Sequence, residues 1–393
     1  MDFRFTKEQE TFRKEVREFC EKEPWGEILD RKVAVNYSPE YYHKVCAKGW
    51  IGLPWPEEYG GQARDFIDSA IFHEEMAYSL APMALNTYGT TVWTCGNIIF
   101  KHGSEQMKRH LLPKITRGEI LIGEAVTEPN AGQDLSMIET RAVFDGDDYI
   151  INGQKMFITH AHKAELGFLF MLMARTNFDA PKEKGLSLFI VDFRSPGITI
   201  RPLWTMSGYR TNEVFFDDVR VPKSNLIGEE NRGLDYFREN IIYVWDRSPG
   251  DVAGWSRRCL EMLIRYVKKN RSKNGELLCK DPLIRQKLAQ MATKAELVRL
   301  CTYRIEWMKD KGFPVISEKL KCELFRHEFM MWFANTALQI LGRYGQLLGG
   351  SKHNLFGGMF ATFYLDWPVW RFTGASEVLR NEIAATVLGM PRL

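Results

Sequence analysis

The sequence lacks several features that mark specialised classes of protein. A membrane-spanning helix needs about 18 apolar residues, and no apolar run within the 393 residues approaches that length. The N-terminal residues 1–8 also lack the apolar segment of a secretory signal. We therefore expect a cytoplasmic protein with no membrane span.

Paired cysteines are missing as well. The seven cysteines are odd in number, show no C-x-x-C spacing and have no histidine cluster of metal-ligand form nearby. We expect reduced, mostly buried thiols and no metal site. The cysteines are Cys20, Cys46, Cys95, Cys259, Cys279, Cys301 and Cys322.

Common nucleotide and hydrolase motifs are absent too. No G-x-G-x-x-G or G-x-x-x-x-G-K-[ST] occurs, which argues against a Rossmann or P-loop site, and no G-x-S-x-G elbow indicates a hydrolase. The sequence also has no large excess of charge of one sign, because it contains 53 Lys and Arg and 50 Asp and Glu, which gives a net charge of +3. The densest basic run, 268–273, is short enough for a solvated helix face or a phosphate contact, so no nucleic-acid partner is expected.

Helical patterns open the chain. Thr6 and Gln9 have the spacing of a capping box, and Phe12, Val16 and Cys20 follow at helical intervals. Helical signals continue to about residue 119, interrupted by a turn-rich stretch at 54–62. Residues 1–120 are therefore predicted to form an N-terminal helical domain.

The spacing of apolar residues along the chain then changes twice. Short runs rich in β-branched and aromatic residues predict a small antiparallel β-domain over residues 121–232, and helical spacing returns over residues 233–393. Segregated helices and strands indicate an α+β fold and not a doubly wound one. The expected strands are 149–159, 168–174, 186–193, 198–203 and 213–221, and the apolar stripe of the last unit contains Leu288, Met291, Ala295, Val298, Ile305 and Met308.

Four segments, in order, resemble one family. Val126–Asp134, V-T-E-P-N-A-G-Q-D, is similar to the V-T-E-P-x-A-G-S-D signature of acyl-CoA dehydrogenases, and Ile151–Thr159, I-N-G-Q-K-M-F-I-T, is similar to their second signature. Gln339–Gly342 resembles the Q-I-L-G segment of their C-terminal helices, and Phe372–Arg380 resembles their closing motif. Together these segments span most of the chain.

The resemblance implies a fold, a reaction and partners. It implies a helical N-terminal domain, a flavin-binding β-domain and a C-terminal four-helix bundle, assembled as a homotetramer or homodimer. It also implies FAD as cofactor, an acyl-CoA thioester as substrate, removal of hydrogen from Cα and Cβ, and an electron-transferring flavoprotein as acceptor.

The resemblance also implies which residues hold the flavin. Around the ring it places Val126, Thr127, Gln133, Phe157 and Thr159, with Gln133 in place of the usual Ser and Phe157 in place of the commoner Trp. A backbone-rich loop suits the hydrogen-bonding edge of the ring and an aromatic side chain suits its face. The alternative is that Phe157 is only a core residue of a strand.

Other flavin contacts are expected from a neighbouring subunit and from the closing motif. Arg271, Gln339 and Gly342 match positions that hold the diphosphate and adenosine of the neighbour's FAD, and an arginine fork suits a diphosphate. Ser376 and Glu377 of the closing motif are assigned to the cofactor as well. The alternative for Arg271 is a surface arginine on a helix.

The catalytic base requires a carboxylate. Many relatives carry a Glu before the Gly of the closing motif, but Thr373 occupies that position here and cannot act as a base. A second group of the family carries an E-R pair on a helix of the C-terminal domain, and its match is Asp246-Arg247. We therefore predict Asp246 as the base, with Glu239 as a second candidate. The alternative is that Asp246 is only a structural partner of Arg247.

The remaining predicted contacts are with the substrate. The backbone N–H of Thr373 is expected to donate to the thioester oxygen, next to Gly374, while Arg247 and Gln133 also contact the substrate. Residues 86–97 match one wall of the acyl cavity and are rich in threonine, including Thr91. This polarity indicates a short, cyclic or functionalised acyl group, although a plain polar helix face would explain it as well.

Two other functions stay open. The chain could be a base-poor subunit of a hetero-oligomeric acyl-CoA dehydrogenase, binding FAD or acyl-CoA without turning over alone. It could also be a relative that catalyses elimination or enoyl-CoA reduction.

Overall fold

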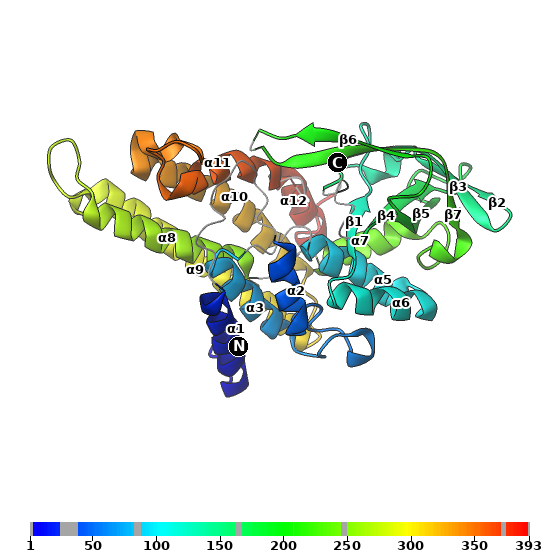
Figure 1. The fold of residues 1–393 in the computed structure, drawn as a ribbon, viewed down its shortest axis with the longest axis horizontal. Helices are drawn as coiled ribbons and strands as arrows, with labels where there is room; N and C mark the ends of the chain where they lie inside the picture. Colours follow the sequence, from blue (N-terminus) through cyan, green and yellow to red (C-terminus); the bar gives the residue numbers. More distant parts are fainter. Residues whose placement is uncertain are drawn as a thin grey trace.

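The computed structural model describes residues 3–23, 38–81, 88–159, 161, 167–206, 208–244, 250–370 and 375–391. Helices come first, strands follow and helices return, so the predicted α+β class is confirmed (Figure 1). The long C-terminal helices extend to one end of the molecule and the sheet occupies the other, with the N-terminal helices below their junction (Figure 1).

The N-terminal helices begin as the capping box predicts. Thr6 Oγ1 accepts the N–H of Gln9 at 3.2 Å, and Gln9 Oε1 accepts the N–H of Thr6 at 3.0 Å. The stripe of Phe12, Val16 and Cys20 is buried in the hydrophobic core that the N-terminal helices share with the sheet. The elements of this unit are α1 (Lys7–Lys22), α2 (Pro39–Ala47), η1 (Glu57–Tyr59), α3 (Phe66–Tyr78), the π-helix η2 (Thr90–Gly96), α5 (Asn97–His102) and α6 (Glu105–Thr116).

A seven-stranded sheet forms the middle of the chain, in the order β1-β4-β2-β3-β7-β6, with β5 paired to β4. The sheet is mixed and not wholly antiparallel, because β1 and β2 both pair in parallel with β4. Its elements are β1 (Leu121–Ala125), η3 (Leu135–Met137), β2 (Arg141–Asp145), β3 (Asp148–Lys155), β4 (Phe168–Arg175), β5 (Leu186–Asp192), β6 (Ile198–Trp204), β7 (Arg210–Pro222) and η5 (Lys223–Asn225).

All five predicted strands form, but two others were missed. The short β1 contains Gly123, and β2 is a five-residue run that alternates only around Ala142, so neither shows a strong strand pattern. Strand β3 ends at Lys155 and not at Thr159, because Phe157 takes a left-handed backbone with φ of 64° that cannot continue a strand.

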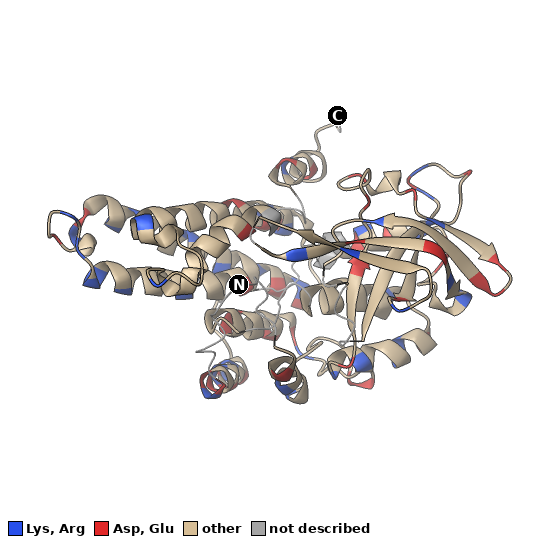
Figure 2. Cartoon of the chain, turned by 45° about the horizontal axis from the view of Figure 1, so that its top comes forward, with Lys and Arg blue, Asp and Glu red and all other residues tan. Residues whose placement is uncertain are grey.

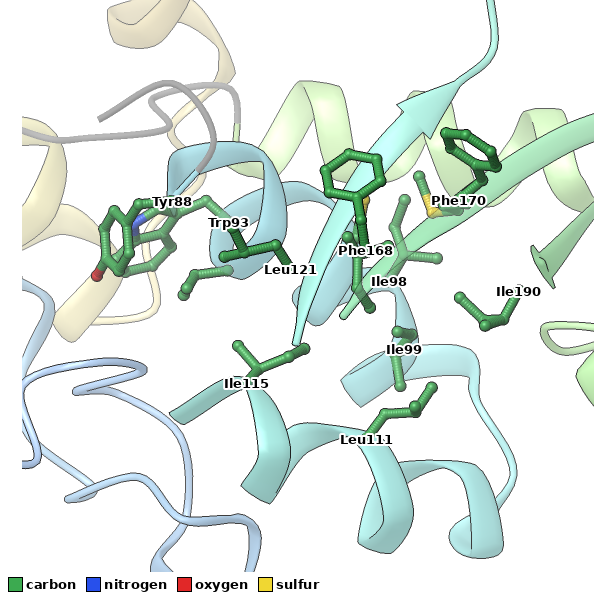
Figure 3. Packing of buried hydrophobic residues seen from close by; sticks show 14 of the residues in the cluster. Tyr88, Trp93, Ile98, Ile99, Leu111, Ile115, Leu121, Phe168, Phe170 and Ile190 are labelled. Atoms are coloured by element: carbon green, nitrogen blue, oxygen red, sulfur yellow. The ribbon is translucent and has the colours of Figure 1, made fainter. Parts of the chain in front are cut away.

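The N-terminal helices pack directly on the sheet. Apolar side chains of η2, α5 and α6 meet those of β1, β4 and β5 in one buried cluster (Figure 3). Gly123 makes room in this contact, since a Cβ there would collide with the ring of Phe168. The labelled members in Figure 3 are Tyr88, Trp93, Ile98, Ile99, Leu111, Ile115, Leu121, Phe168, Phe170 and Ile190.

The C-terminal unit is a bundle of long helices. The predicted stripe of α9 is confirmed, with Met291, Ala295, Val298 and Ile305 buried. The elements are α7 (Gly233–Val244), α8 (Asp251–Lys269), η6 (Leu278–Lys280), α9 (Pro282–Asp310), α10 (Ile316–Leu341), η7 (Gly342–Gln346), η8 (Phe356–Gly358), α11 (Met359–Trp370), α12 (Ser376–Glu382) and the π-helix η10 (Ile383–Val387).

The two helical units are joined by a helix cap that crosses between them. The carboxylate of Asp310, the last residue of α9, accepts the N–H of Phe66 at 2.7 Å and of Ile67 at 3.3 Å, at the start of α3. A carboxylate satisfies the unpaired donors of a helix N-terminus and interacts favourably with its dipole. Asp310 therefore ties the bundle to the N-terminal helices that support the sheet.

Candidate active site

The two signature segments lie side by side at the ends of β1 and β3. Thr127 O accepts the N–H of Met156 at 2.9 Å, and Thr127 Oγ1 donates to Met156 O at 2.5 Å. Residues that are 29 positions apart in the sequence are thus held together by backbone and side chain. The structure therefore brings the predicted flavin residues Val126 and Thr127 next to Phe157.

A buried ion pair lies behind this contact. Lys155 is 0% exposed and Glu128 is 8% exposed, and Lys155 Nζ lies 2.8 Å from Glu128 Oε1 and donates to Val126 O at 2.9 Å. The carboxylate of Glu128 also accepts the N–H groups of Glu139, at 2.7 Å, and of Thr140, at 3.0 Å. Every oxygen of the carboxylate is therefore bonded.

Burial and charge act in opposite directions on this pair. Burial lowers the pKa of Lys155 to about 8, although the nearby Glu128 carboxylate opposes that shift. Burial would raise the pKa of Glu128, but Lys155 and the hydrogen bonds to the carboxylate outweigh it and lower the pKa. Sequence reasoning missed both residues, and the available signal was a lysine at an inward position of an apolar strand.

The segment around Phe157, next to the contact between Thr127 and Met156, forms an open edge. Phe157 is 62% exposed, so the alternative that it is a core residue is wrong. Its neighbour Ile158 is tied to buried Asn212, whose side-chain amide donates to Ile158 O at 2.7 Å while Asn212 O accepts the Ile158 N–H at 2.8 Å. Thr159 is half-buried. The backbone on both sides of Phe157 is thus fixed while its ring projects from the sheet.

The rest of the first signature forms a loop with an adjacent groove. Gln133 is exposed, and a Cβ added at Gly132 would meet nothing within 4 Å. Beyond this loop, a groove of about 750 Å³ runs between the signature and the β4–β5 connection. Its lining includes Pro129, Asn130, Arg141, Phe178 and Lys182.

A second group of predicted flavin residues lies at the far end of the bundle. Arg271 lies in the loop between α8 and α9, not on a helix, and its Nη1 donates to Gly275 O at 2.7 Å. Gln339 is exposed near the end of α10 and its Oε1 accepts Lys287 Nζ, from the first turns of α9, at 2.7 Å. Gly342 ends α10 with a φ of 67°. These residues therefore share one end of the bundle.

That end is remote from the sheet. The α8–α9 loop and the strands occupy opposite ends of the ribbon (Figure 1), and Lys and Arg account for much of the colour at the tip of this loop (Figure 2). One chain therefore does not bring Arg271 to the open edge beside Phe157.

The predicted base and thioester contacts lie outside the described residues. These are Asp246, Arg247, Thr373 and Gly374. The second candidate base, Glu239 of α7, is described and lies beside two basic side chains of α5, with Lys101 Nζ at 3.2 Å and His102 Nε2 at 3.4 Å. Its carboxylate is therefore engaged with the N-terminal unit.

The other predicted contacts have mixed surroundings. At the start of α12, Ser376 is buried and Glu377 is exposed. Thr91 is 0% exposed, and its hydroxyl both donates to Ile122 O at 3.1 Å and accepts the Ile122 N–H at 3.0 Å. The hydroxyl of Thr91 therefore joins η2 to β1.

Sequence patterns for three domains of one family match most of the chain. The acyl-CoA dehydrogenase N-terminal domain matches residues 6–119, the middle domain matches residues 123–219 and the C-terminal domain matches residues 250–388. These ranges follow the helix–strand–helix order of the fold.

Individual relatives agree over nearly their whole length. Acyl-CoA dehydrogenase FadE29 of Mycobacterium tuberculosis is 36% identical, covering 99% of this chain and 98% of the relative. The solved Tcur3481-Tcur3483 steroid ACAD superposes with a TM-score of 0.89 at 28% identity, covering 100% of both chains. The ChsE4-ChsE5 complex from Mycobacterium tuberculosis gives a TM-score of 0.85 at 28% identity, again over 100% of both chains.

The signature segments, the mixed sheet between two helical units and these similarities agree with one another. The chain belongs to the acyl-CoA dehydrogenase family, whose members are FAD-dependent oxidoreductases acting on CH–CH groups.

Proposed function

We propose that this chain binds FAD at the open edge beside Phe157 and dehydrogenates an acyl-CoA thioester between Cα and Cβ. The observation that carries the proposal is the junction of the two signatures, where Thr127 and Met156 are bonded and Phe157 projects from the sheet. When bound, FAD supplies the acceptor for the hydride from Cβ.

The residues of this edge fit a flavin. Among the residues that the structure describes, the N–H of Thr127 has no hydrogen-bond partner, so it is free to donate to a ligand. Phe157 offers an aromatic face next to that donor. A donor edge beside an aromatic face suits a planar heteroaromatic ring, and covering the exposed Phe157 would exclude water from the site.

Proton abstraction falls to a carboxylate in this proposal. Asp246 takes the Cα proton, with Arg247 beside it for orientation and charge balance, and the N–H of Thr373 donates to the thioester oxygen as negative charge develops there. Gly374 lets the chain approach the flavin closely. Glu239 is the weaker candidate, since its carboxylate lies against Lys101 and His102.

We further propose that the acyl group carries a ring. The likeness to the steroid ACAD and the threonine-rich segment near Thr91 support this proposal, although the Thr91 hydroxyl itself bonds β1. The groove beside Asn130 and Phe178 suits the nucleotide end of coenzyme A, because Arg141 and Lys182 supply cations and Phe178 supplies an exposed ring.

An electron-transferring flavoprotein is the proposed acceptor, in the cytoplasm, where cysteines remain reduced thiols. We propose a homotetramer or homodimer, because Arg271 reaches the flavin edge only from another chain. No helix in the described part of the chain is long and apolar enough to cross a bilayer.

The proposed reaction is tested by anaerobic flavin bleaching. The purified protein is mixed with short-chain, branched, aromatic and steroid acyl-CoA thioesters, and we expect bleaching with a ring-bearing substrate. Asp246→Asn should retain FAD and lose about three or more orders of magnitude in the bleaching rate, as expected when a general base acting with other groups is removed.

Each other outcome has its own meaning. Near-normal bleaching by Asp246→Asn removes Asp246 from the role of base. A flavin that bleaches only after a second polypeptide is added favours the hetero-oligomeric subunit, which the similarity to the ChsE4-ChsE5 complex makes worth testing. Product analysis distinguishes dehydrogenation from elimination or reduction, and a protein that takes up no FAD contradicts the proposal.

Binding of the coenzyme A end is tested separately. Lys182→Ala should raise KM for the acyl-CoA about tenfold, the factor expected when one charge-assisted contact to a phosphate is lost. The matched control is the N-acetylcysteamine thioester of the same acyl group, which lacks the nucleotide and should keep its KM. An equal rise in KM for both thioesters would argue against the groove.

A further inference from the structure

We propose that the buried pair Lys155–Glu128 is a positioning device that places and strengthens the N–H of Thr127 as a donor to the flavin. This inference rests on the proposed function, because it assigns a role toward FAD at the same edge. The pair itself is buried and lies behind the backbone, so it would act through that backbone and not by contact.

The first step is the polarisation of one peptide group. Lys155 Nζ donates to Val126 O at 2.9 Å, and the carbonyl of Val126 belongs to the same peptide unit as the N–H of Thr127. A cation on the oxygen side draws electron density toward the carbonyl and makes the N–H at the other end a stronger donor. Burial keeps water from screening that effect.

The second step is rigidity. Through Glu128, the pair also holds the N–H groups of Glu139 and Thr140, while Thr127 is bonded on its other side to Met156. Three segments of chain therefore fix the direction of the Thr127 N–H before a ligand arrives. A donor that is already oriented loses less entropy on binding.

The third step is that stability alone does not account for the pair. Removing two charges from water costs roughly several kcal/mol per ion, and apolar residues of similar volume often stabilise a core at least as much as a buried ion pair does. Lys155 and Glu128 nevertheless occupy the centre of the signature contact. A role in the site at their front gives a reason for a cation there.

A double variant tests this role. Lys155→Met/Glu128→Gln removes both charges together, so neither partner is left as an unpaired buried ion. We expect FAD affinity, measured by quenching of flavin fluorescence, to fall about tenfold and the reduction potential of the bound flavin to become more negative, because the reduced ring loses a strong donor. Both readouts are independent of catalytic activity.

The chain contains a matched control. Lys309 and Glu306 of α9 form another ion pair, at 2.7 Å, away from the sheet, in which Glu306 is buried and Lys309 is half-buried. Lys309→Met/Glu306→Gln should lower the thermal unfolding temperature to a similar extent while leaving FAD affinity and reduction potential as in the wild type. If Lys155→Met/Glu128→Gln does not fold, Lys155→Gln/Glu128→Gln, which keeps hydrogen-bonding amides in place, should shift both readouts in the same direction.

The outcomes separate the inference from the proposed function. If the wild type binds FAD and the Lys155/Glu128 variant matches it in affinity and potential, the positioning role is wrong and the proposed function stands. If the two double variants change affinity and potential equally, the role of the pair is only structural. If the wild type binds no FAD, the proposed function fails first.

Discussion

Glu75 of α3 shows how a single buried charge holds two helices together. It is 0% exposed, and α1 supplies two arginines to its carboxylate, with Arg13 Nε at 2.7 Å and Arg17 Nη2 at 2.8 Å from Oε1. Burial by itself would raise the pKa of Glu75, but the bonds from Arg17 and Arg13 outweigh it and lower the pKa.

Glu75→Gln should therefore destabilise the protein in a pH-dependent manner. We expect a loss of about 2 kcal/mol at pH 7, because two partly exposed arginines lose a shared carboxylate. A lowered folded pKa stabilises the protein at pH values above the unfolded pKa of about 4.3, and that contribution is lost as the pH falls through the folded pKa. Urea unfolding of both proteins from pH 7 to pH 4 checks this, and a difference that grows on acidification would contradict it.

Cys301 is the second residue with a distinct chemical expectation. A hydrogen bond with Cys322 lowers the pKa of Cys301 to about 7, with burial opposing and with Arg304 and Lys321 contributing to the shift. The two thiols belong to one small cluster between α9 and α10. At pH 7 a larger fraction of Cys301 than of an ordinary cysteine is therefore the reactive thiolate.

Iodoacetamide at pH 7 should alkylate Cys301 about tenfold faster than Cys279, the other half-buried thiol, as judged by peptide mass spectrometry. The rate at Cys301 should level off above about pH 8, where nearly all of the thiol is ionised. Cys322→Ala removes the hydrogen bond and serves as the control, since it should slow the reaction at pH 7. Equal rates at Cys301 and Cys279 would show that the pKa is not lowered.

At the level of elements, the crossing of α3 and α8 depends on one glycine. A Cβ at Gly254 would collide with the carbonyl oxygen of Glu74 and lie 2.8 Å from Tyr78 N, so backbone meets backbone with no flexible side chain to move aside. The two helices are the main contact between the N-terminal unit and the bundle.

Gly254→Ala should thus destabilise the chain even though alanine favours a helix. The gain in helix propensity is about 1 kcal/mol, whereas overpacking costs about 1–3 kcal/mol and here acts on backbone atoms. Thermal unfolding should shift downward, while Gly132→Ala, at a position with open space around it, should shift it little. A stabilised Gly254→Ala variant would show that α3 and α8 separate easily.

Elements also differ in how well local patterns predict them. The capping box at Thr6 and the stripe on α9 are local, and both are confirmed. Strands β1 and β2 were missed, because a five-residue strand shows little of its period and its pairing with β4 is a long-range contact. The turn at Phe157 was missed since a left-handed backbone at a bulky residue is imposed by its surroundings.

At the level of the whole molecule, the predicted flavin residues are divided between distant regions. Thr127 and Phe157 follow β1 and β3 of the sheet, while Arg271 lies in the α8–α9 loop, and these elements occupy opposite ends of the ribbon (Figure 1). If Arg271 holds the FAD of a neighbour, each complete site in the proposed homo-oligomer combines two chains. Symmetric pairing then gives two such sites for each pair of chains.

Mixing two inactive variants tests this arrangement. Asp246→Asn should inactivate the site of its own chain, and Arg271→Glu should weaken FAD binding in the neighbour's site. Each is assayed alone first. Random remixing of the two should restore about a quarter of the wild-type activity, because half of the pairs are mixed and each mixed pair contains one intact site. No recovery in remixed oligomers would place Asp246 and Arg271 in the same chain's site.

The sequence by itself determined the order of helical and strand-rich units, the capping box, the apolar stripe and the two signatures, because each depends on neighbours within a few turns or one strand. Tertiary structure alone decided that Lys155 meets Glu128, that Thr91 bonds β1 and that Arg271 lies far from Phe157. Those relations depend on how distant segments pack. Packing of the sheet takes the cation of Lys155 out of water and places it behind the candidate flavin edge.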